Sequence, residues 1–203
     1  LLNSMSTPNI ESSVQEEQPQ ENLSQPESLK SYCNGLSYNE AENHSLENIN
    51  HIYVQILDNR GWNLNLMSAY IDNGKIIDVK YKKKYDAEIK FTYKNNTECT
   101  FSSRVRINGD WVDHIKQLQN GQLISSLDIE LIEGNVQNIT KFKLFLPETR
   151  LSDNEIFVTT MMEQLGFLTP KTQKVYVNLN GNTSPFLFQE KIVKEMIENN
   201  LYR

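Results

Sequence analysis

The stretch KKKYDAEIKFTYKNNTECTFSSRVRI, residues 82–107, decides the fold because it holds two alternating runs on either side of a turn signal. In the first run, Ala87, Ile89 and Phe91 share one face, and polar side chains occupy the other. This period of two is typical of a β-strand with one buried face. Asn95-Asn96 predicts a turn, and ECTFSSRVRI returns as another strand. The stretch therefore predicts two neighbouring antiparallel strands.

The residues before this stretch continue the same pattern. HIYVQILD at 51–58 has an apolar residue at every second position, which predicts a strand. WNLNLMSAYI at 62–71 alternates again, DNG at 72–74 is a strong hairpin signal, and KIIDVKY at 75–81 follows as a strand. Short strands separated by turn dipeptides predict an antiparallel sheet or sandwich in this part of the chain.

Beyond residue 120, strands are followed by a helix. SSLDIEL at 125–131 and ITKFKLFLP at 139–147 are strand-like runs. LSDNEIFVTTMMEQLG at 151–166 changes to a helical period, with Phe157, Met161 and Leu165 four residues apart. A capping box of Ser152 with Glu155 marks its beginning, and Gly166 marks its end. This segment predicts a helix.

The last segments predict a strand and a second helix. TPKTQKVYVNLNG at 169–181 is strand-like and closes on an Asn-Gly turn. KIVKEMIENN at 191–200 has the pattern of an amphipathic helix. SPFLFQEK at 184–191, between them, fits either a helix start at Ser-Pro or a strand paired across the Asn-Gly turn.

The first 48 residues differ in composition from the rest. They are rich in Ser, Gln, Glu, Asn and Pro, and such a segment buries too little apolar surface to offset its ordering entropy. We expect residues 1–48 to be a disordered polar tail or linker, and residues 49–203 to be one domain. The predicted fold class is α+β: mainly antiparallel β-sheet, with one or two packed helices in the C-terminal half.

Bulk composition excludes some functions. The net charge of −6 argues against a nucleic-acid partner, which usually binds a basic face. No apolar run reaches the roughly 20 residues of a membrane-spanning helix. The chain has two cysteines, Cys33 and Cys99, which we expect to be free thiols because disulfide frameworks are usually denser. Three scattered histidines predict no zinc site.

The order of motifs in the C-terminal half resembles a known family. An Arg-x-Arg strand with a turn comes first, then KFKLFLPETR, then a helix ending in LGF, then VYVNLNG and an apolar run closing on Gln189-Glu190. This order, over roughly residues 85–195, resembles the amino-terminal lobe of the CotH kinase family, the spore-coat-type atypical protein kinases. The V-x-V-N-x-N-G segment and Gln189-Glu190 carry most of the specificity.

The resemblance implies an activity and has clear departures. It implies ATP and magnesium as cofactors, a protein hydroxyl as substrate, and an extracytoplasmic or cell-surface location. The family's Gly-x-Tyr after the Asn-Gly turn is replaced by residues 182–186, NTSPF, and its early basic run is matched only by Lys82–Lys84. The chain ends at Arg203, before the family's metal-binding aspartates, so we expect it to be the front part of a larger protein.

Two pairs of cations are candidates for phosphate binding. Arg104 and Arg106 are two residues apart on a predicted strand, share a face, and can bind a phosphate bidentately. The alternative is a solvated strand face with carboxylate partners on the neighbouring strand. Lys141 and Lys143 have the same spacing, and the resemblance implies a nucleotide-facing position for one of them. A plain solvent face is the alternative.

Two further residues complete the predicted nucleotide site. Arg150 stands just before the predicted helix, where a positive charge opposes the helix dipole, so we expect an anionic partner: Glu148, Asp153 or a ligand. Glu190 falls where the resembling family keeps a glutamate, which implies that it orients a lysine or a metal. A solvated glutamate is the alternative.

The stretch RVRINGDWVDH, residues 104–114, raises other possibilities. Asn108-Gly109 predicts either a simple hairpin turn or a phosphate-cradling loop. Asp110, Asp113 and His114 could together bind a divalent cation, but acidic turns are more often solvated, so we assign no metal ligand. Trp111 is interpreted as an anchor for the turn, with stacking on a base or sugar as the alternative.

Two functional hypotheses therefore remain. The first is the amino-terminal lobe of a CotH-like atypical kinase, with Arg106, Lys143 and Glu190 in phosphate-facing or orienting roles. The second is a non-catalytic β-sandwich binding or structural module at a cell surface, favoured by the regular strand series at 51–107. Neither a G-x-S-x-G motif nor a P-loop occurs, so serine-hydrolase and Walker-type nucleotide sites are unsupported.

Overall fold

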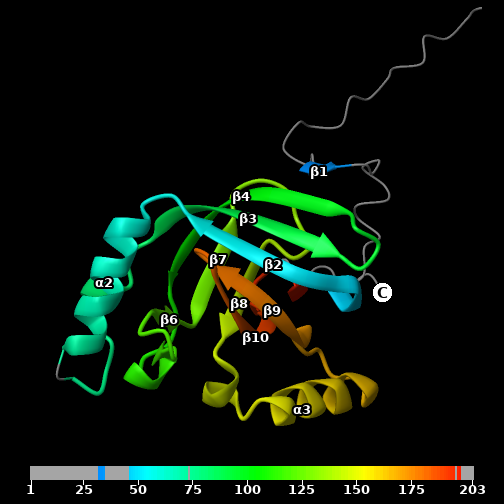
Figure 1. The fold of residues 1–203 in the computed structure, drawn as a ribbon. Helices are drawn as coiled ribbons and strands as arrows, with labels where there is room; N and C mark the ends of the chain where they lie inside the picture. Colours follow the sequence, from blue (N-terminus) through cyan, green and yellow to red (C-terminus); the bar gives the residue numbers. More distant parts are fainter. Residues whose placement is uncertain (1–31, 35–45, 73, 195, 198–203) are drawn as a thin grey trace, which may run out of the picture.

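The computed structural model describes residues 32–34, 46–72, 74–194 and 196–197, which form a closed seven-stranded β-barrel (Figure 1). The strands of the barrel are β2 (Ile49–Ile56), β3 (Tyr85–Tyr93), β4 (Glu98–Ile107), β7 (Leu127–Leu131), β8 (Lys141–Phe145), β9 (Thr172–Leu179) and β10 (Asn182–Glu190). Their order is β4-β3-β2-β9-β10-β8-β7, and β7 pairs with β4 to close the ring.

Most of the neighbouring strands are antiparallel, as expected. β2 and β9 are the exception and run parallel, with His51 opposite Tyr176. The predicted α+β fold with mainly antiparallel pairing is confirmed. The expected open sheet or sandwich is wrong, because the sheet closes into a barrel. Closure depends on β4, whose last five residues pair with β7 while most of its length pairs with β3. A barrel has no exposed strand edge along its closed circumference.

The interior of the barrel holds the apolar face of each strand. On β2, Ile52, Val54 and Ile56 are fully buried, which confirms the alternation expected at 51–58. Phe142 and Phe188 stack with ring centroids 4.8 Å apart, and Phe91 packs edge-on against Phe142. The side chains between them point outward, so the polar residues of the same strands form the outer surface.

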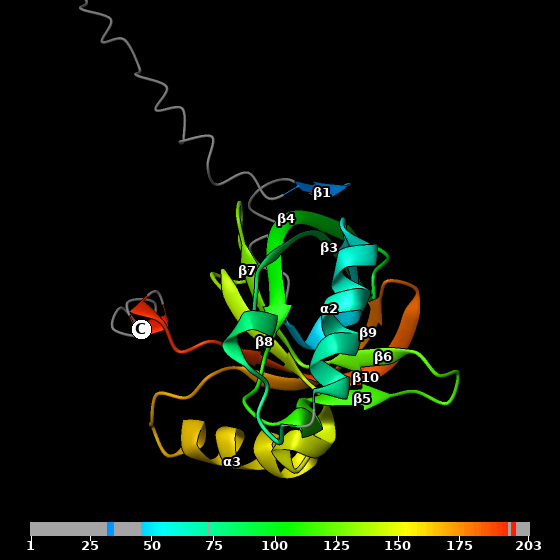
Figure 2. The same cartoon turned by 90° about the vertical axis from the view of Figure 1, so that its left-hand side faces the viewer.

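The segment expected as a strand at 62–71 is instead a helix, α2 (Asn59–Ile71). Trp62, Leu66 and Ala69 are buried at helical spacing, so the apparent alternation hides a period of 3.6 residues. The helix begins at Asp58, whose carboxylate accepts the N–H of Gly61 at 2.8 Å. It lies across one end of the barrel, in front of the strands in Figure 2.

The hairpin signal at 72–74 and the strand expected at 75–81 are also wrong in the described part of that region. Asp72 ends α2, with its N–H bonded to the carbonyl of Ser68. Ile76 forms an isolated bridge with Trp111, and residues Val79–Tyr81 form the 3₁₀ helix η3. Asn73 lies outside the described residues. The segment crosses from α2 towards the loop after β4 instead of pairing as a hairpin.

The helix expected at 151–166 is confirmed as α3 (Asp153–Gln164), but two details differ. Ser152 has φ +51° and makes no capping bond to the helix, so the predicted capping box does not form. The apolar face of α3 is not part of the core: Phe157 is 66% exposed, and Leu165 is exposed as well. Gly166, at φ +83°, donates its N–H to the carbonyl of Glu163 and ends the helix as predicted.

The ambiguous segment at 184–191 is a strand. Asn180 and Gly181 form a two-residue loop in which both φ angles are positive, +48° and +93°. Positive φ at both central residues is typical of type I′ hairpin turns. At the predicted final helix, Lys194 and Met196–Ile197 are helical, and the rest of 195–200 lies outside the described residues.

Shorter elements complete the structure. They are β1 (Tyr32–Asn34), η2 (Leu46–Asn48), η4 (Val112–His114), the ribbon of β5 (Ile115–Gln117) with β6 (Leu123–Ser125), and η5 (Pro147–Arg150). The β5–β6 ribbon packs beside α2 (Figure 2). None of the helices in the described residues is long and apolar enough to cross a membrane.

The predicted N-terminal tail lies mostly outside the described residues, which omit 1–31 and 35–45. Within it, β1 pairs with the beginning of β4. The free-thiol expectation is wrong for Cys99, which is disulfide-bonded and lies opposite Cys33, the chain's other cysteine, in the β1–β4 register. Disulfides are typical of oxidising compartments.

Candidate functional site

Four of the predicted cations lie side by side on the outer face of the barrel. In one row across three strands, Arg106 of β4 is opposite Asp128 of β7, which is opposite Lys143 of β8. In the next row, Arg104, Glu130 and Lys141 are opposite one another in the same way. Residues two apart on a strand share a face, so both rows face outward together.

The first part of this surface is a hollow of about 250 Å3 in which each lining cation is ion-paired. The hollow is lined by Lys84, Arg104, Arg106, Asp128, Glu130, Lys141 and Lys191. Asp128, only 7% exposed, accepts two hydrogen bonds from Arg106, at 2.9 and 2.5 Å, and binds Nζ of Lys191 at 3.0 Å. Glu130 pairs with Lys84 and Lys141.

Arg104 completes the pairing of the first hollow. It lies 3.8 Å from Asp86 on the neighbouring strand β3. The interpretation of Arg104 and Arg106 as residues with cross-strand carboxylate partners is therefore confirmed for both. Arg106 nevertheless also lines a second hollow.

The second hollow has a volume of about 370 Å3 and the same formal charge as the first, but two of its cations form no ion pair with a described residue. It is lined by Lys82, Arg106, Ile107, Asn108, Gly109, Asp110, Trp111, His114, Lys143, Phe145 and Arg150. Four cations and one carboxylate line it, so its formal charge is +3 with His114 neutral. We call it the cationic hollow. The loop at 107–111 and Arg150 of the 3₁₀ helix η5 both contribute to its lining.

Lys143 and Arg150 form no ion pair with another described residue. Both lie against the buried ring of Phe145, with Nζ of Lys143 at 5.5 Å and Cζ of Arg150 at 4.3 Å from its centroid. Burial lowers the pKa of Lys143, and the nearby cations Lys191, Arg150 and Arg106 lower it further, against the opposing effect of Asp128. A bound anion would relieve this crowding of positive charge.

Arg150 was expected to have an anionic partner. Both predicted carboxylates bind other side chains: Glu148 pairs with Lys116, and Asp153 pairs with Lys174 at 2.8 Å. Neither predicted carboxylate is therefore the ion-pair partner of Arg150.

The Asn108-Gly109 turn shapes one wall of the cationic hollow. It does not join two paired strands, so the simple hairpin interpretation is wrong. Gly109 has φ +103°, and a Cβ atom there would lie 2.1 Å from Cδ2 of His114. Only glycine allows this close approach, because it lacks Cβ and tolerates positive φ. The N–H of Asn108 is held by the carbonyl of Ser126 at 2.8 Å.

The acidic residues beside this turn have other partners or environments. Lys82 binds Asp110 at 2.5 Å and lowers the pKa of that carboxyl. Burial lowers the pKa of His114, against the effect of Asp113. Among the residues that the structure describes, no group of three or more His, Cys, Asp or Glu side chains could hold a metal ion.

Trp111 and Glu190 lie differently from what was expected. Trp111 is 56% exposed and lines the cationic hollow, so it is not a buried anchor. Glu190 lines neither hollow: its carboxylate accepts the backbone N–H of Lys171 at 3.2 Å, and it lies opposite Phe142 in the register. The residue of β10 opposite Lys143 is Gln189. Glu190 is thus the one predicted site residue that is not brought to this surface.

Sequence reasoning missed Asp128 and Lys191. Asp128 is the carboxylate that joins Arg106 to Lys191, and it is itself buried. The sequence did contain a signal for Asp128. Asp128 and Glu130 are two residues apart in LDIEL and so share a face of their strand, like the pairs Arg104–Arg106 and Lys141–Lys143. The strand pairing that brings the three pairs together is not visible in the sequence.

Comparison with protein-family models and with curated proteins finds no match to this chain. The functional argument therefore depends on the site itself.

Proposed function

We propose that the cationic hollow binds the phosphates of a nucleotide, and that the chain is the nucleotide-facing amino-terminal lobe of a CotH-like atypical kinase. In this proposal the complete protein transfers the γ-phosphate of ATP to a protein hydroxyl. The observation that carries the proposal is the pair Lys143 and Arg150, two partly buried cations that form no ion pair with a described residue.

The chemistry of phosphoryl transfer supports this use of the hollow. The reaction requires little covalent chemistry from the protein, and needs cations and N–H groups placed on the phosphate oxygens. Arg150 offers a planar fork for two phosphate oxygens, and Lys143 offers a single compact charge. Arg106 is already oriented by Asp128 and can contribute its remaining N–H groups.

Trp111 supports a nucleotide over a bare phosphate. Its exposed ring lies in the same hollow as the cations, and aromatic side chains are common stacking partners for bases. The volume of about 370 Å3 falls within the usual range of ligand pockets, about 300–1,000 Å3.

The described residues fit magnesium less well than they fit phosphate. Magnesium usually binds one or two carboxylates together with the substrate phosphates. Here Lys82 holds Asp110, and Arg106 and Lys191 hold Asp128. We therefore assign these residues to phosphate binding and derive no step through the metal.

The binding part of the proposal can be tested by NMR, because the chain has only two tryptophans, Trp62 and Trp111. In a ¹⁵N-labelled chain, the variant Trp111→Phe assigns the two indole N–H signals. We expect ATP and inorganic tripolyphosphate to shift the Trp111 signal, and AMP to bind more weakly. Absence of a shift at about 10 mM ATP, a free energy of binding weaker than about 3 kcal/mol, would overturn the proposal.

Charge removal gives the matched comparison. Hydrogen bonds to charged groups contribute about 1.5–3 kcal/mol, so Lys143→Gln and Arg150→Gln should each weaken ATP binding roughly 10- to 100-fold. Lys94→Gln, at an exposed lysine outside the hollow, should leave the affinity unchanged. Equal affinity in all three variants would place the phosphates elsewhere.

The kinase part needs a separate readout. The complete protein, incubated with magnesium and γ-labelled ATP, is expected to transfer label to a serine, threonine or tyrosine hydroxyl, and Arg150→Gln should reduce that transfer. ATP binding without any transfer would refute the kinase hypothesis and favour the non-catalytic binding module.

A further inference from the structure

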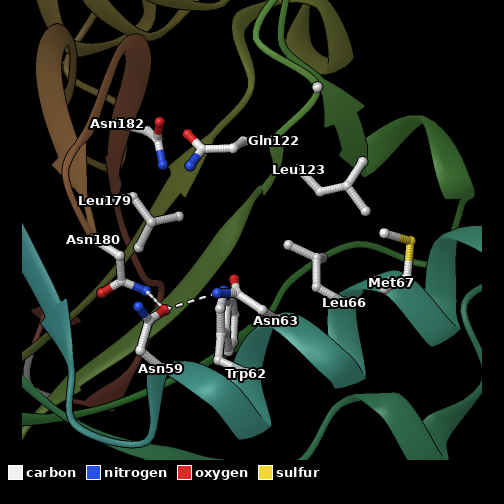
Figure 3. A pocket seen from close by; sticks show the side chains of 11 residues that line it. Asn59, Trp62, Asn63, Leu66, Met67, Gln122, Leu123, Leu179, Asn180 and Asn182 are labelled. Carbon is white, nitrogen blue, oxygen red and sulfur yellow. Dashed lines mark hydrogen bonds between the residues drawn. The ribbon is translucent and has the colours of Figure 1, made fainter.

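A third hollow, of about 270 Å3, opens between α2, the loop joining β5 to β6, and the β9–β10 hairpin (Figure 3). It is lined by Asn59, Trp62, Asn63, Leu66, Met67, Gly121, Gln122, Leu123, Leu179, Asn180 and Asn182. These residues come from three segments far apart in the sequence, and none of them lines either hollow of the cationic surface. We call it the amide hollow.

One side of the amide hollow is a network centred on Asn59. Its side-chain carbonyl accepts hydrogen bonds from the amides of Asn180, at 2.9 Å, and Asn63, at 3.1 Å. Asn180 is itself fixed because its carbonyl accepts the N–H of Ile56 at 2.8 Å. The carbonyl of Asn59 is thus used within the protein, and its NH2 group makes no hydrogen bond to another described residue. Figure 3 shows these side chains on one wall of the hollow.

A second group of amide side chains in the hollow has the same design. The amide of Asn120 donates to the carbonyl oxygen of Gln122 at 2.9 Å and to that of Asn182 at 3.3 Å. Both carbonyls are therefore engaged, which leaves the NH2 groups of Gln122 and Asn182 as donors. Figure 3 shows the side chains of Gln122 and Asn182 close to each other.

The remaining wall is apolar. Leu66, Met67 and Leu123 lie together on the side away from Asn180 and Asn182 (Figure 3). Met67 is substantially exposed, whereas Leu66 is fully buried. Trp62 lies between the apolar wall and the asparagine network, with its ring packed edge-on against Tyr85 at 5.4 Å.

The lining chemistry selects a class of ligand. No Asp, Glu, Lys, Arg or His is among the lining residues, so a charged ligand would lose hydration without gaining an ion pair. Three NH2 groups whose carbonyls are engaged favour a ligand with several separate acceptor oxygens. A nucleobase edge is better matched by both atoms of one amide acting together. An extended peptide needs a longer groove than this compact hollow offers.

We propose that the amide hollow binds a neutral sugar ring, as a carbohydrate-recognition site separate from the phosphate site. The hydroxyl and ring oxygens accept from Asn59, Gln122 and Asn182, and the C–H face of the ring packs on Met67 and Leu123, which Leu66 supports from beneath. The volume is just below the usual range for drug-sized ligands and suits one ring.

The two tryptophans allow this proposal to be tested independently of the proposed function. Trp62 lines the amide hollow and Trp111 lines the cationic hollow. Titration of the ¹⁵N-labelled chain with glucose, galactose, mannose and N-acetylglucosamine is expected to shift the Trp62 indole signal for at least one sugar and leave Trp111 unchanged. ATP should give the reverse result.

Substitution at Gln122 provides the matched control. Gln122→Glu keeps the shape of the side chain but replaces the NH2 donor with a charged acceptor. The affinity for whichever sugar binds should therefore fall roughly tenfold or more. Gln55→Glu makes the same change on an exposed face of β2 outside the hollow and should have no effect on binding.

Three results would overturn the proposal. One is that no sugar of the panel shifts the Trp62 signal up to about 50 mM, because any binding would then be weaker than a matched site should give. Another is equal sugar affinity in Gln122→Glu and Gln55→Glu. The third is a Trp62 shift with an uncharged tetrapeptide but with no sugar, which would make the amide hollow a peptide site.

Discussion

The hydroxyl oxygen of Ser126 lies 2.9 Å from Nδ1 of His114, which lines the cationic hollow. The same oxygen accepts the N–H of Leu146 at 2.9 Å, just before η5, which carries Arg150. The backbone of Ser126 also binds the carbonyl of His114 and the N–H of Asn108. One fully buried serine therefore holds the loop at 107–114 and η5 in place together.

The first prediction compares two adjacent buried serines. Ser126→Ala removes the acceptor for Leu146 and the contact to His114, and an unsatisfied buried group costs about 1–3 kcal/mol. Ser125→Ala removes a hydroxyl that is buried and has no hydrogen-bond partner in the described structure, so it should be neutral or stabilising. Urea unfolding of both variants measures the difference. Equal losses of stability would contradict the role of Ser126.

The second prediction concerns the close approach of Gly109 to His114. Gly109→Ala places Cβ 2.1 Å from the imidazole at φ +103°, and we expect it to cost more than about 1 kcal/mol of unfolding free energy. Gly121→Ala is the control, because Gly121 has φ +82° but nothing within 4 Å of its Cβ position. It isolates the cost of positive φ. A Gly109→Ala variant as stable as Gly121→Ala would show that the loop relaxes freely.

The third prediction follows from the lowered pKa of His114. Burial disfavours the protonated imidazole in the fold, so the folded pKa lies below the ordinary value of 6.5. Below pH 6.5 the unfolded chain binds more protons at this site, and stability is lost as the pH falls towards the folded pKa. We expect the unfolding free energy to drop between pH 7.5 and 5.5, and to drop less in His114→Gln.

The control for this titration is a second pH interval. Between pH 8.5 and 7.5 the imidazole is neutral in both states, so wild type and His114→Gln should change equally there. A larger drop in the variant than in wild type between pH 7.5 and 5.5 would reverse the sign and refute the assignment.

The fourth prediction contrasts the two helices. Leu66 of α2 is 0% exposed, so Leu66→Ala should cost about 2–5 kcal/mol. Phe157 of α3 is mostly exposed, so Phe157→Ser should change stability by no more than about 0.5 kcal/mol. Thermal unfolding of the two variants measures both changes in stability. A large loss in Phe157→Ser would mean that the apolar face of α3 packs on something in solution.

The regular strands were predictable because alternation is a local property. Ala87, Ile89 and Phe91 are all buried, as their spacing indicates. The segment of α2 was not predictable in the same way, because Trp62, Leu64 and Leu66 fit a strand while Trp62, Leu66 and Ala69 fit a helix. The two patterns differ in Leu64, which is exposed in the structure, and in Ala69, which is buried. Contacts with the barrel end, not local spacing, choose between them.

The candidate site was predictable in part for the same reason. A period of two places Arg104 with Arg106, and Lys141 with Lys143, on one face of their own strands. Glu190 shows the limit: it and Gln189 are neighbours in sequence, but only Gln189 lies opposite Lys143. A shift of one residue in register exchanges the two faces, and register is set by the partner strand.

The sequence by itself determined which side chains share a face of each strand, since that depends only on the backbone geometry of consecutive residues. The tertiary structure alone decided that β7 lies between β4 and β8, that the sheet closes, and that Arg150, Lys143 and the loop at 107–111 line one hollow. These arrangements come from pairing and packing between residues far apart in the chain. Their stability depends on the whole barrel, which no local pattern encodes.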